Sequence, residues 1–464
     1  MTENPEGTVL TYRPDVVKKV KNRIIPFLVL LYIIAFIDRA NIGYAALEMN
    51  EDLGITPTQF GLIAGLFSIG YFLFEVPSNL LMRKVGARRW IARILVSWGI
   101  VAVATGFVQN VVQLGVIRTI LGIAEAGFFP AVILYLSYWF PERDRARVVA
   151  LFMVALPVAT VIAGPLSGYI LDNIHWFGLE SWRWIFILQG APAVALGVIS
   201  LYVIVDLPNK AKWLAPDEKE WLNATLEHEE AVKVTKHKHQ SFLQSLAGAK
   251  TLALALIYYS KSVAIYVLAF FTPSIVKGLG ENLSNTTVGF LTTIPYICAA
   301  IFMVWWAKHS DRKQERRWHV ALPLFTAAAG LILMVFTEDS IVLSLVLLTV
   351  VTVAVYATYG PFWSLPSLFM TGSAAAVGMA SINSIANLGG FVGPFGFGAL
   401  QSATGGIYVG LFIVAATLII AGLLVVRLQF VKRAEAIARR VVVEEDPALT
   451  AVVAHTDADS KVTP

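Results

Sequence analysis

Long apolar stretches alternate with short polar segments along most of the chain. The first stretch, Ile24–Gly43, carries no charge before Asp38. A run of about 20 apolar residues is long enough for an α-helix to cross a bilayer, whereas core helices of soluble proteins are shorter and alternate with polar positions. The pattern predicts twelve membrane-spanning helices, at about 24–46, 58–81, 91–109, 112–139, 148–171, 182–206, 251–276, 287–307, 318–337, 341–364, 373–400 and 406–428.

The polar segments divide the chain into five predicted parts. Trp213 and Trp221 favour a helix of the central linker that lies at the membrane interface. The charged, aromatic-poor C-terminal tail is typical of a short helix followed by disorder. We expect an N-terminal segment (1–23), a six-helix bundle (24–206), a linker (207–250), a second six-helix bundle (251–428) and a tail (429–464).

The distribution of charge between the loops predicts the topology. Basic residues gather in the loops after the second, fourth and eighth predicted helices, and acidic residues gather in loops on the opposite side. The positive-inside rule therefore places both termini and the linker in the cytoplasm of a cell with a plasma or inner membrane. The basic residues are Arg83, Lys84, Arg88, Arg89, Arg143, Arg145, Arg147, Lys308, Arg312, Lys313, Arg316 and Arg317, and the acids are Glu48, Glu51, Asp52, Glu338 and Asp339.

Two sequence matches with the same offset indicate an internal repeat. The pair Arg83 and Lys84 precedes Arg312 and Lys313 by 229 residues, and both pairs run on to an Arg-Arg-Trp. The pair that begins at Gly164 precedes its match at Gly393 by the same distance. Two parallel six-helix repeats are the plan of a rocking transporter, so we predict an all-α membrane protein of two pseudo-symmetric bundles.

Composition excludes several other classes. The chain is 57% hydrophobic and 14% charged, whereas a soluble domain has about 25% charged residues. Its net charge of +5 comes mainly from short loops, so we expect no nucleic-acid partner. A single cysteine, Cys298, allows no internal disulfide. The segment His237–His239 fits a solvated loop better than a metal site, and no catalytic motif lies near a membrane face. We therefore predict a monomer without metal, cofactor or enzymatic activity.

Several ionisable residues lie inside the predicted helices. Five buried charges without partners would cost on the order of 12–17 kcal/mol, so they must be paired or hydrated. The residues that share this unusual placement are Asp38, Arg39 and Asn41 in helix 1, Tyr71 and Glu75 in helix 2, Arg118 and Glu125 in helix 4, Lys261 in helix 7, and Asn383 and Asn387 in helix 11.

Two interpretations of these charges remain open. Ion pairs between helices 1 and 4 would merely lock the bundle, but buried pairs stabilise poorly compared with apolar packing. The alternative is a solute pathway. With Glu75 set aside, five charges remain, and their sum of +1 suits an organic anion; they are Asp38, Arg39, Arg118, Glu125 and Lys261. A carboxylate among them can bind and release a proton. We expect Arg39 to grip a substrate carboxylate, with Lys261 as the second cation.

The remaining polar residues complete this hypothesis. Tyr71, Asn383 and Asn387 would give the substrate neutral hydrogen bonds, whereas Glu75 is expected to hold the end of helix 2 near the basic loop. Core packing or a position at the membrane interface is the better interpretation of each remaining aromatic candidate, although these residues could line a cavity. The aromatic candidates are Tyr258, Tyr259, Tyr296, Tyr359 and Trp363.

The motifs resemble the anion:cation symporters of the major facilitator superfamily, in the branch with tartrate, phthalate and 4-hydroxyphenylacetate permeases. The resemblance covers about residues 23–428. Its motifs are Asp38-Arg39-Ala40-Asn41, Arg118 through Glu125 to Pro130, Trp139-Phe140-Pro141-Glu142-Arg143, Glu75-Val76-Pro77-Ser78-Asn79, Val85-Gly86-Ala87-Arg88-Arg89-Trp90, Trp182-Arg183-Trp184, Lys212-Trp213-Leu214 and Ile382 to Gly390.

The resemblance implies proton-coupled uptake of an organic acid by alternating access. It implies that Asp38 and Glu125 bind protons, that Arg39 binds the substrate carboxylate and that Arg118 tunes the acids. Sugar-acid transporters of this family have a glutamine in helix 5, where this chain has Leu156. That departure favours a less hydroxylated mono- or dicarboxylate, including aromatic acids. An exporter or antiporter of the same fold is the alternative, and a membrane sensor or enzyme is disfavoured.

Overall fold

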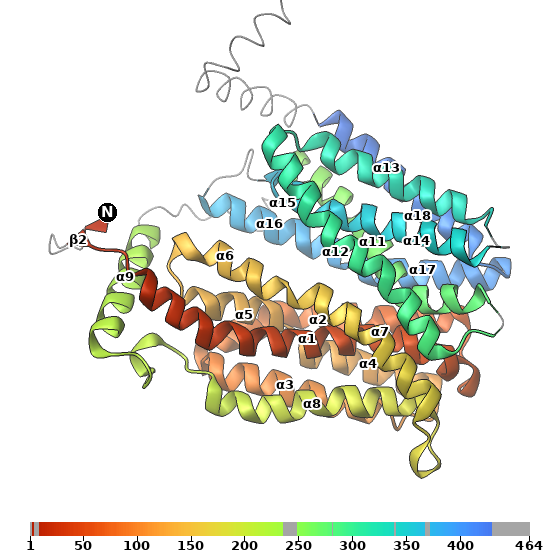
Figure 1. Ribbon diagram of the computed structural model, residues 1–464, viewed down its shortest axis with the longest axis horizontal. Helices are drawn as coiled ribbons and strands as arrows, with labels where there is room; N and C mark the ends of the chain where they lie inside the picture. Colours follow the sequence, from red (N-terminus) through yellow and green to blue (C-terminus); the bar gives the residue numbers. More distant parts are fainter. Residues whose placement is uncertain are drawn as a thin grey trace, which may run out of the picture.

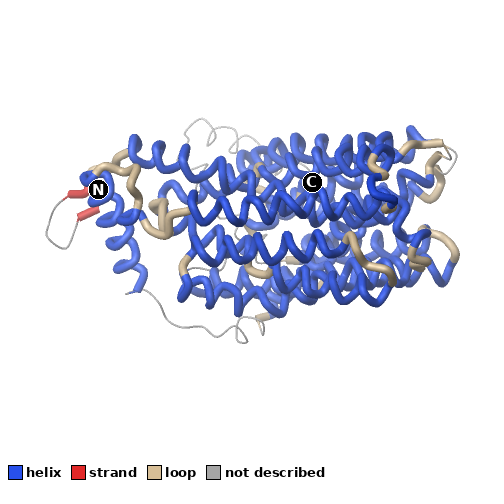
Figure 2. The backbone as a smooth tube through the Cα atoms, turned by 90° about the horizontal axis from the view of Figure 1, so that it is seen from below, coloured by secondary structure: helices blue, strands red, loops and turns tan. Residues whose placement is uncertain are grey.

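The computed structural model describes residues 2–3, 9–234, 248–280, 282–337, 340–366 and 372–428. The predicted tail (429–464), the segment His237–His239 and the acids Glu338 and Asp339 lie outside this part. Helices run along a common direction, and a two-stranded antiparallel hairpin of β1 (Thr2–Glu3) and β2 (Val9–Leu10) lies at one end (Figure 2). The all-α prediction is therefore confirmed apart from this small hairpin.

Two helical bundles make up the structure (Figure 1). The N-terminal half holds α1 (Pro14–Asp52), α2 (Pro57–Val85), α3 (Ala87–Thr105), α4 (Val111–Glu125), α5 (Phe128–Ser137), α6 (Glu142–Met153), α7 (Ala155–Asn173) and α8 (Ser181–Val203), with the 3-10 turn η1 (Trp176–Gly178) before α8. After η2 (Pro208–Lys210) and α9 (Pro216–Val234), the C-terminal half holds α11 (Ala249–Gly278), α12 (Asn285–Lys313), α13 (Arg317–Met334), α14 (Ile341–Ala357), α15 (Tyr359–Trp363), α16 (Gly372–Asn387), α17 (Gly389–Thr404) and α18 (Tyr408–Arg427).

Every predicted apolar window coincides with helix. Ten helical segments of the described chain are long and apolar enough to cross a membrane. The other two windows correspond to α3, which carries three arginines near its start, and to α16 and α17, which are separate helices of 16 residues each. Ten of the twelve windows thus correspond to segments with the length and apolarity of a membrane span, and the windows of α3 and of α16 with α17 do not reach both.

The polar segment before the first window is helical from Pro14 onward. Helix α1 begins at Pro14 because Val16, Val17 and Val20 are buried, at a spacing that puts them on one face. They belong to the same apolar cluster as Trp221 of α9. The Trp221 indole also donates to the Thr11 carbonyl oxygen at 2.9 Å. This tryptophan therefore packs against the N-terminal half.

Salt bridges reinforce the contact between α9 and the start of α1. Arg13 pairs with Asp217 at 2.8 Å, and Lys19 pairs with Glu218 at 2.7 Å. These hydrogen-bonded cations lower the pKa of both carboxyl groups. Trp213 stacks on Trp139, with ring centres 5.6 Å apart. The described part of the linker is thus attached to the N-terminal half.

Breaks in four of the membrane spans strengthen the evidence for an internal repeat. The fourth span breaks at Ala126 and Gly127, between α4 and α5, and the tenth breaks at Thr358, between α14 and α15. The fifth span breaks at Val154, and the eleventh breaks at Leu388. Corresponding spans of the two halves are therefore interrupted at corresponding places, as expected for parallel repeats.

The two halves meet at the end of the bundle remote from the start of α1 and the end of α18. We call this end the far side, and the opposite end the terminal side. Here α2 packs on α17, and α7 packs on α12, through glycines. A Cβ at Gly398 would lie 2.1 Å from the Pro57 carbonyl oxygen, and one at Gly289 would lie 2.2 Å from the Gly164 carbonyl oxygen. Only residues without a side chain allow this close approach.

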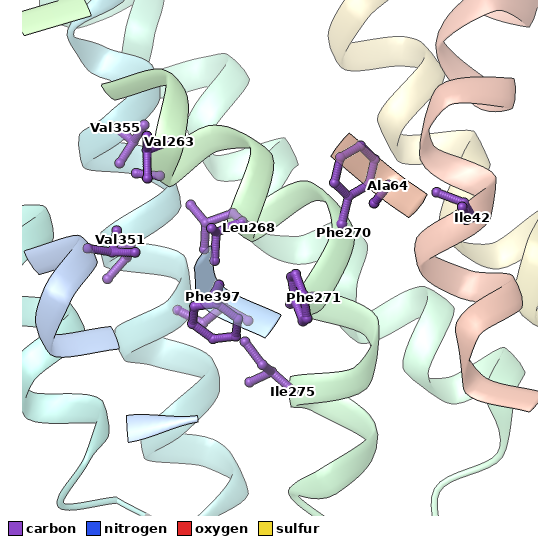
Figure 3. Close-up of a cluster of buried hydrophobic side chains, with 14 of the residues drawn as sticks. Ile42, Ala64, Val263, Leu268, Phe270, Phe271, Ile275, Val351, Val355 and Phe397 are labelled. Atoms are coloured by element: carbon purple, nitrogen blue, oxygen red, sulfur yellow. The ribbon is translucent and has the colours of Figure 1, made fainter. Parts of the chain in front are cut away.

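An apolar cluster joins the halves next to these glycines. Figure 3 shows Ile42 and Ala64 of the N-terminal half beside Phe270 and Phe271 of α11. The Phe271 ring lies 4.7 Å from that of Phe397 of α17, between ring centres. Inter-half hydrogen bonds also lie on the far side, among them those that the Asp172 carboxylate of α7 accepts from two backbone N–H groups at the start of α12.

The terminal side of α2 presents apolar side chains to the surroundings. Leu73, Val76 and Leu80 are each more than half exposed, whereas Phe60 and Ala64 on the far-side part of the same helix are buried. The structure is therefore closed between its halves on the far side.

Candidate functional site

Asp38 lies in the middle of α1 and is 1% exposed. Its Oδ2 accepts a hydrogen bond from the Trp98 indole of α3 at 2.6 Å, and its Oδ1 accepts one from the Asn41 amide at 2.9 Å. Asn41 follows Asp38 by three residues, so the two side chains share one face of the helix. The carboxylate is therefore held by two neutral donors rather than by a direct salt bridge.

Arg39 and Glu125 form the ion pair at the centre of the N-terminal half. The Nε and Nη2 atoms of Arg39 both lie 2.6 Å from Oε1 of Glu125. Oε2 of Glu125 has no hydrogen-bond partner among the described residues. The glutamate side chain is fully buried, whereas that of Arg39 is 24% exposed. The guanidinium thus contacts a buried acid while part of it remains accessible.

The break in helix 4 positions Glu125. It is the last residue of α4, and Gly127 follows at φ +83°, a conformation that favours glycine. A side chain at Gly127 would also meet Ser78 of α2, since a Cβ there would lie 2.5 Å from Oγ. The glycine therefore both ends the helix beneath the carboxylate and lets α2 approach.

Arg118 lies about two turns before Glu125 on α4 and is 1% exposed. None of its three guanidinium nitrogens has a hydrogen-bond partner among the described residues. Its nearest described cation–π neighbour is Phe67 of α2, with the ring centre 5.3 Å away. Arg118 interacts electrostatically with both Asp38 and Glu125 without touching either, so it adds positive charge between the two acids.

The C-terminal half contributes one buried cation. Lys261 of α11 is 1% exposed, and its Nζ has no hydrogen-bond partner among the described residues. The ammonium lies 3.0 Å from the ring centre of Tyr359 and 4.4 Å from that of Tyr258. Aromatic faces attract a cation only weakly compared with a carboxylate. Among the described residues, Lys261 therefore has no carboxylate partner.

The break in helix 11 lies beside Lys261. A Cβ at Gly389 would meet Ser262 and Tyr259 of α11, and one at Gly390 would meet both Ser68 of α2 and Tyr266 of α11. The two predicted asparagines, Asn383 and Asn387, precede this break on α16, where both are partly exposed. Neither side-chain amide has a hydrogen bond to another described residue. Their amides are free to bind a ligand.

Tyr71 and Glu75 follow one another along α2. The Tyr71 ring centre lies 5.0 Å from the Arg39 guanidinium, next to Phe67 on the same face. Glu75 is partly exposed one turn further on, and its carboxylate makes no ion pair with any described basic residue. The predicted contact of Glu75 with the basic loop is therefore not formed among the described side chains.

Two residues that the sequence analysis did not single out contribute to this region. Trp98 donates a hydrogen bond to Asp38, and Tyr266 of α11 lies with Ser68 of the opposite half against Gly390. Trp98 could have been singled out from the sequence, because tryptophans favour membrane interfaces and one in the middle of a span is unusual. Tyr266 could not, because it is one of many aromatic residues in the seventh window.

Comparison with known proteins agrees with the fold and the motifs. Residues 28–394 match the Major Facilitator Superfamily. A protein of Agrobacterium vitis named as a tartrate transporter is 48% identical over 88% of this chain and 93% of its own. A quinolone resistance transporter of Acinetobacter baumannii is 40% identical over 87% of this chain and 92% of its own.

The fold also matches solved structures. The crystal structure of a D-xylose-proton symporter superposes with a TM-score of 0.71 at 16% identity, over 88% of this chain and 97% of the other. At that identity the likeness concerns the fold alone. Together with the close sequence relatives it confirms the resemblance found in the motifs. The chain is a multi-pass membrane transporter, not an enzyme, and it belongs to the Major Facilitator Superfamily.

Proposed function

We propose that this transporter takes up a small organic anion together with protons by alternating access. The observation that carries the proposal is the Arg39–Glu125 pair, in which a partly exposed guanidinium contacts a fully buried carboxylate through one oxygen only. A guanidinium binds carboxylates best through two parallel hydrogen bonds. A substrate carboxylate can therefore compete with Glu125 for Arg39 once Glu125 is neutral.

Proton coupling follows from this competition. When Glu125 takes up a proton, its negative charge disappears and Arg39 is left without a counter-ion. A substrate carboxylate then replaces that charge, so proton and anion favour each other's binding. Asp38 is the second proposed proton site, and Arg118 stabilises the ionised form of both acids. The reverse order of events on the other side of the membrane would release both ligands.

The substrate is proposed to be a mono- or dicarboxylate, with aromatic acids included. Arg39 and the unpaired Lys261 lie in opposite halves, so an anion bound to both would favour closure of the site between them. Tyr71, Asn383 and Asn387 would supply neutral hydrogen bonds. The rings around both cations, such as Phe67 and Tyr359, favour an apolar body between the charged ends. The relative named for tartrate supports a dicarboxylate.

We further propose that the chain acts as a monomer in the plasma or inner membrane, with both termini cytoplasmic. The basic loops at the terminal side support this orientation through the positive-inside rule. The far side would then face outward, and the structure would represent a state that is open toward the cytoplasm.

A binding experiment tests the proposal. The purified transporter is screened by thermal shift against small carboxylic acids at two pH values, because a ligand of the folded state raises the melting temperature. We expect a selective acid whose effect grows at the lower pH and is lost in Arg39→Ala. Arg93→Ala removes another arginine of the same half and is expected to retain the effect. Unchanged stabilisation in Arg39→Ala would contradict the proposal.

Export is the second candidate, because one close relative is named for quinolone resistance. An exporter of the same fold would exchange its solute for protons, so the solute would move in the direction opposite to the protons. Proteoliposomes with an imposed gradient distinguish the two directions. Accumulation on the alkaline side supports uptake with protons, and accumulation on the acidic side supports exchange.

A further inference from the structure

The two oxygens of the Asp38 carboxylate have different neighbours. Trp98 donates to Oδ2, and Asn41 donates to Oδ1. All three side chains are essentially inaccessible, with exposures of 1% for Asp38 and 0% for both partners. The charged groups that face this carboxylate are Arg39 on its own helix and Arg118 and Glu125 on α4. None of these charged groups hydrogen-bonds to Asp38, so the neutral partners Trp98 and Asn41 are the side chains in direct contact with its oxygens.

The chemistry of those partners distinguishes the two oxygens. An indole N–H can only donate, so Trp98 cannot accept a hydrogen bond from a protonated Oδ2. A side-chain amide can do either, because its nitrogen donates and its oxygen accepts. The Asn41 carbonyl oxygen is buried and has no hydrogen-bond partner among the described residues. An acceptor is thus available next to Oδ1, and the neighbour of Oδ2 offers none.

We propose that Asp38 takes up its proton on Oδ1, where the Asn41 amide holds it, and that Trp98 is the positioning residue that fixes this choice. On protonation, the Asn41 amide turns by half a rotation so that its oxygen accepts the new O–H. The Trp98 N–H continues to donate to Oδ2, which becomes the carbonyl oxygen of the neutral acid. The Trp98–Asp38 and Asn41–Asp38 hydrogen bonds are thus kept in both states, while the end of the Asn41 amide turned away from Asp38, its oxygen in the charged state and its NH2 in the neutral state, has no partner among the described residues.

In this arrangement, Asp38 gains or loses a proton through the rotation of one neighbouring side chain. The amide nitrogen and oxygen are almost the same size, so their exchange needs no movement of α1 or α3. Asn41 therefore serves the charged and the neutral acid alike, whereas the bond from Trp98 favours the charged form, because hydrogen bonds to ionised groups are stronger. The inference rests on the proposed role of Asp38 as a proton site.

Infrared difference spectroscopy of the full chain in lipid tests the proposal without any substrate. A pH titration reveals the carbonyl stretch of the protonated Asp38 carboxyl group, identified by its absence in Asp38→Asn. A carbonyl stretch rises in frequency when it loses a hydrogen-bond donor. If Oδ2 is the carbonyl oxygen, Trp98→Phe raises the frequency and Asn41→Leu leaves it almost unchanged. The opposite pattern would place the proton on Oδ2 and overturn the proposal.

The titration midpoint provides a second readout. Loss of the indole donor destabilises the ionised form, so Trp98→Phe is expected to shift the midpoint upward by about one pH unit. Asn41→Leu, which loses a partner in both states, is expected to shift it by less than half as much. Trp182→Phe is the matched control, because it removes the indole bond to Asp52, at 3.1 Å, and leaves Asp38 untouched. A larger shift in Asn41→Leu than in Trp98→Phe would overturn the proposal.

Failure of this inference can be distinguished from failure of the proposed function. Trp98 is fully buried, and if Trp98→Phe does not fold, Asn41→Leu alone decides, since a raised carbonyl frequency in that variant contradicts a proton on Oδ1. If wild-type protein shows no carboxyl band that depends on Asp38, both the inference and the role of Asp38 in coupling fail. Proton-driven uptake in proteoliposomes tests the transport proposal independently.

Discussion

Closure of the far side depends on the absence of a side chain at Gly398. A Cβ at this position of α17 would lie 2.1 Å from the Pro57 carbonyl oxygen and 2.9 Å from its carbon, both in the backbone of α2. Ordinary van der Waals contact begins at about 3.4 Å, so one helix must move away by more than an ångström. Gly398→Ala therefore opposes the contact between the halves without altering any ionisable group.

The size of the effect follows from the cost of overpacking, which is typically about 1–3 kcal/mol. That cost applies only to the state in which α2 and α17 touch. The equilibrium between far-side-closed and far-side-open states should accordingly shift toward the open state by about fivefold to 150-fold. Gly396→Ala is the matched control, because Gly396 lies two residues earlier on the same helix and a Cβ there would meet no atom within 4 Å.

Distances between spin labels on the far side measure this equilibrium. Labels at Glu51→Cys and Asn282→Cys, in a Cys298→Ser background, report from exposed positions of opposite halves. We expect longer distances to dominate in Gly398→Ala and the wild-type distribution to persist in Gly396→Ala. If both variants keep the wild-type distribution, the glycine contact does not control closure and the reasoning is wrong.

Three further predictions concern other parts of the structure. Asp172→Asn weakens the cap that α7 places on α12, so the same labels should report a shift toward the open state by about fivefold, for a loss of about 1 kcal/mol; wild-type distances would contradict this. Lys261→Met should abolish carboxylate binding while the ligand-free protein melts at an equal or higher temperature, because an unpaired buried ammonium is costly; a lower melting temperature with binding retained would show that the lysine is structural. Arg183→Met should lower the free energy of unfolding by about 3 kcal/mol, since the guanidinium donates to the Val108 carbonyl oxygen at 2.6 Å and pairs with Glu180, whereas exposed Arg312→Met should change it by less than about 0.5 kcal/mol. The hydrogen bond from Arg183 lowers the pKa of the Glu180 carboxyl group. The pair therefore contributes its full stability at pH values above the usual glutamate pKa, and this contribution to the free energy of unfolding is lost as the pH falls through the lowered pKa.

Much of the architecture could be predicted from the sequence because a bilayer imposes a simple length rule. A helix that crosses hydrocarbon must be apolar over about 20 residues, so every span left a visible window. The start of α1 at Pro14 was missed because its buried face, formed by Val16, Val17 and Val20, alternates with lysines and reads as polar on average. Packing against α9, which lies far along the chain, stabilises that extension.

The candidate site was only partly predictable. Charges inside apolar helices are conspicuous, and Asp38, Arg39, Arg118 and Glu125 all lie in the interior of the N-terminal half. Their pairing was not predictable in detail, because it depends on how α1, α3 and α4 are oriented. The helix break after Glu125 depends on the positive φ of Gly127. It could not be predicted, because glycine is too common in membrane helices to indicate a break by itself.

The contacts of Trp98 and Gly398 also could not be predicted from the sequence. Each contact joins residues from different helices that are distant in sequence, and neither leaves a local pattern. The structure therefore adds the positioning of Asp38 and the contact that closes the far side to what the sequence pattern predicts.

The central claim is that a carboxylate and a proton meet at Arg39 and Glu125 between the two halves. Its most direct test is simultaneous recording of proton and anion entry into proteoliposomes, with tartrate and the acids found by thermal shift as probes. We predict that both fluxes occur together in wild-type protein, that Arg39→Ala abolishes both, and that Glu125→Gln exchanges the anion without moving protons. Coupled proton and carboxylate influx that persists unchanged in both variants would contradict the account.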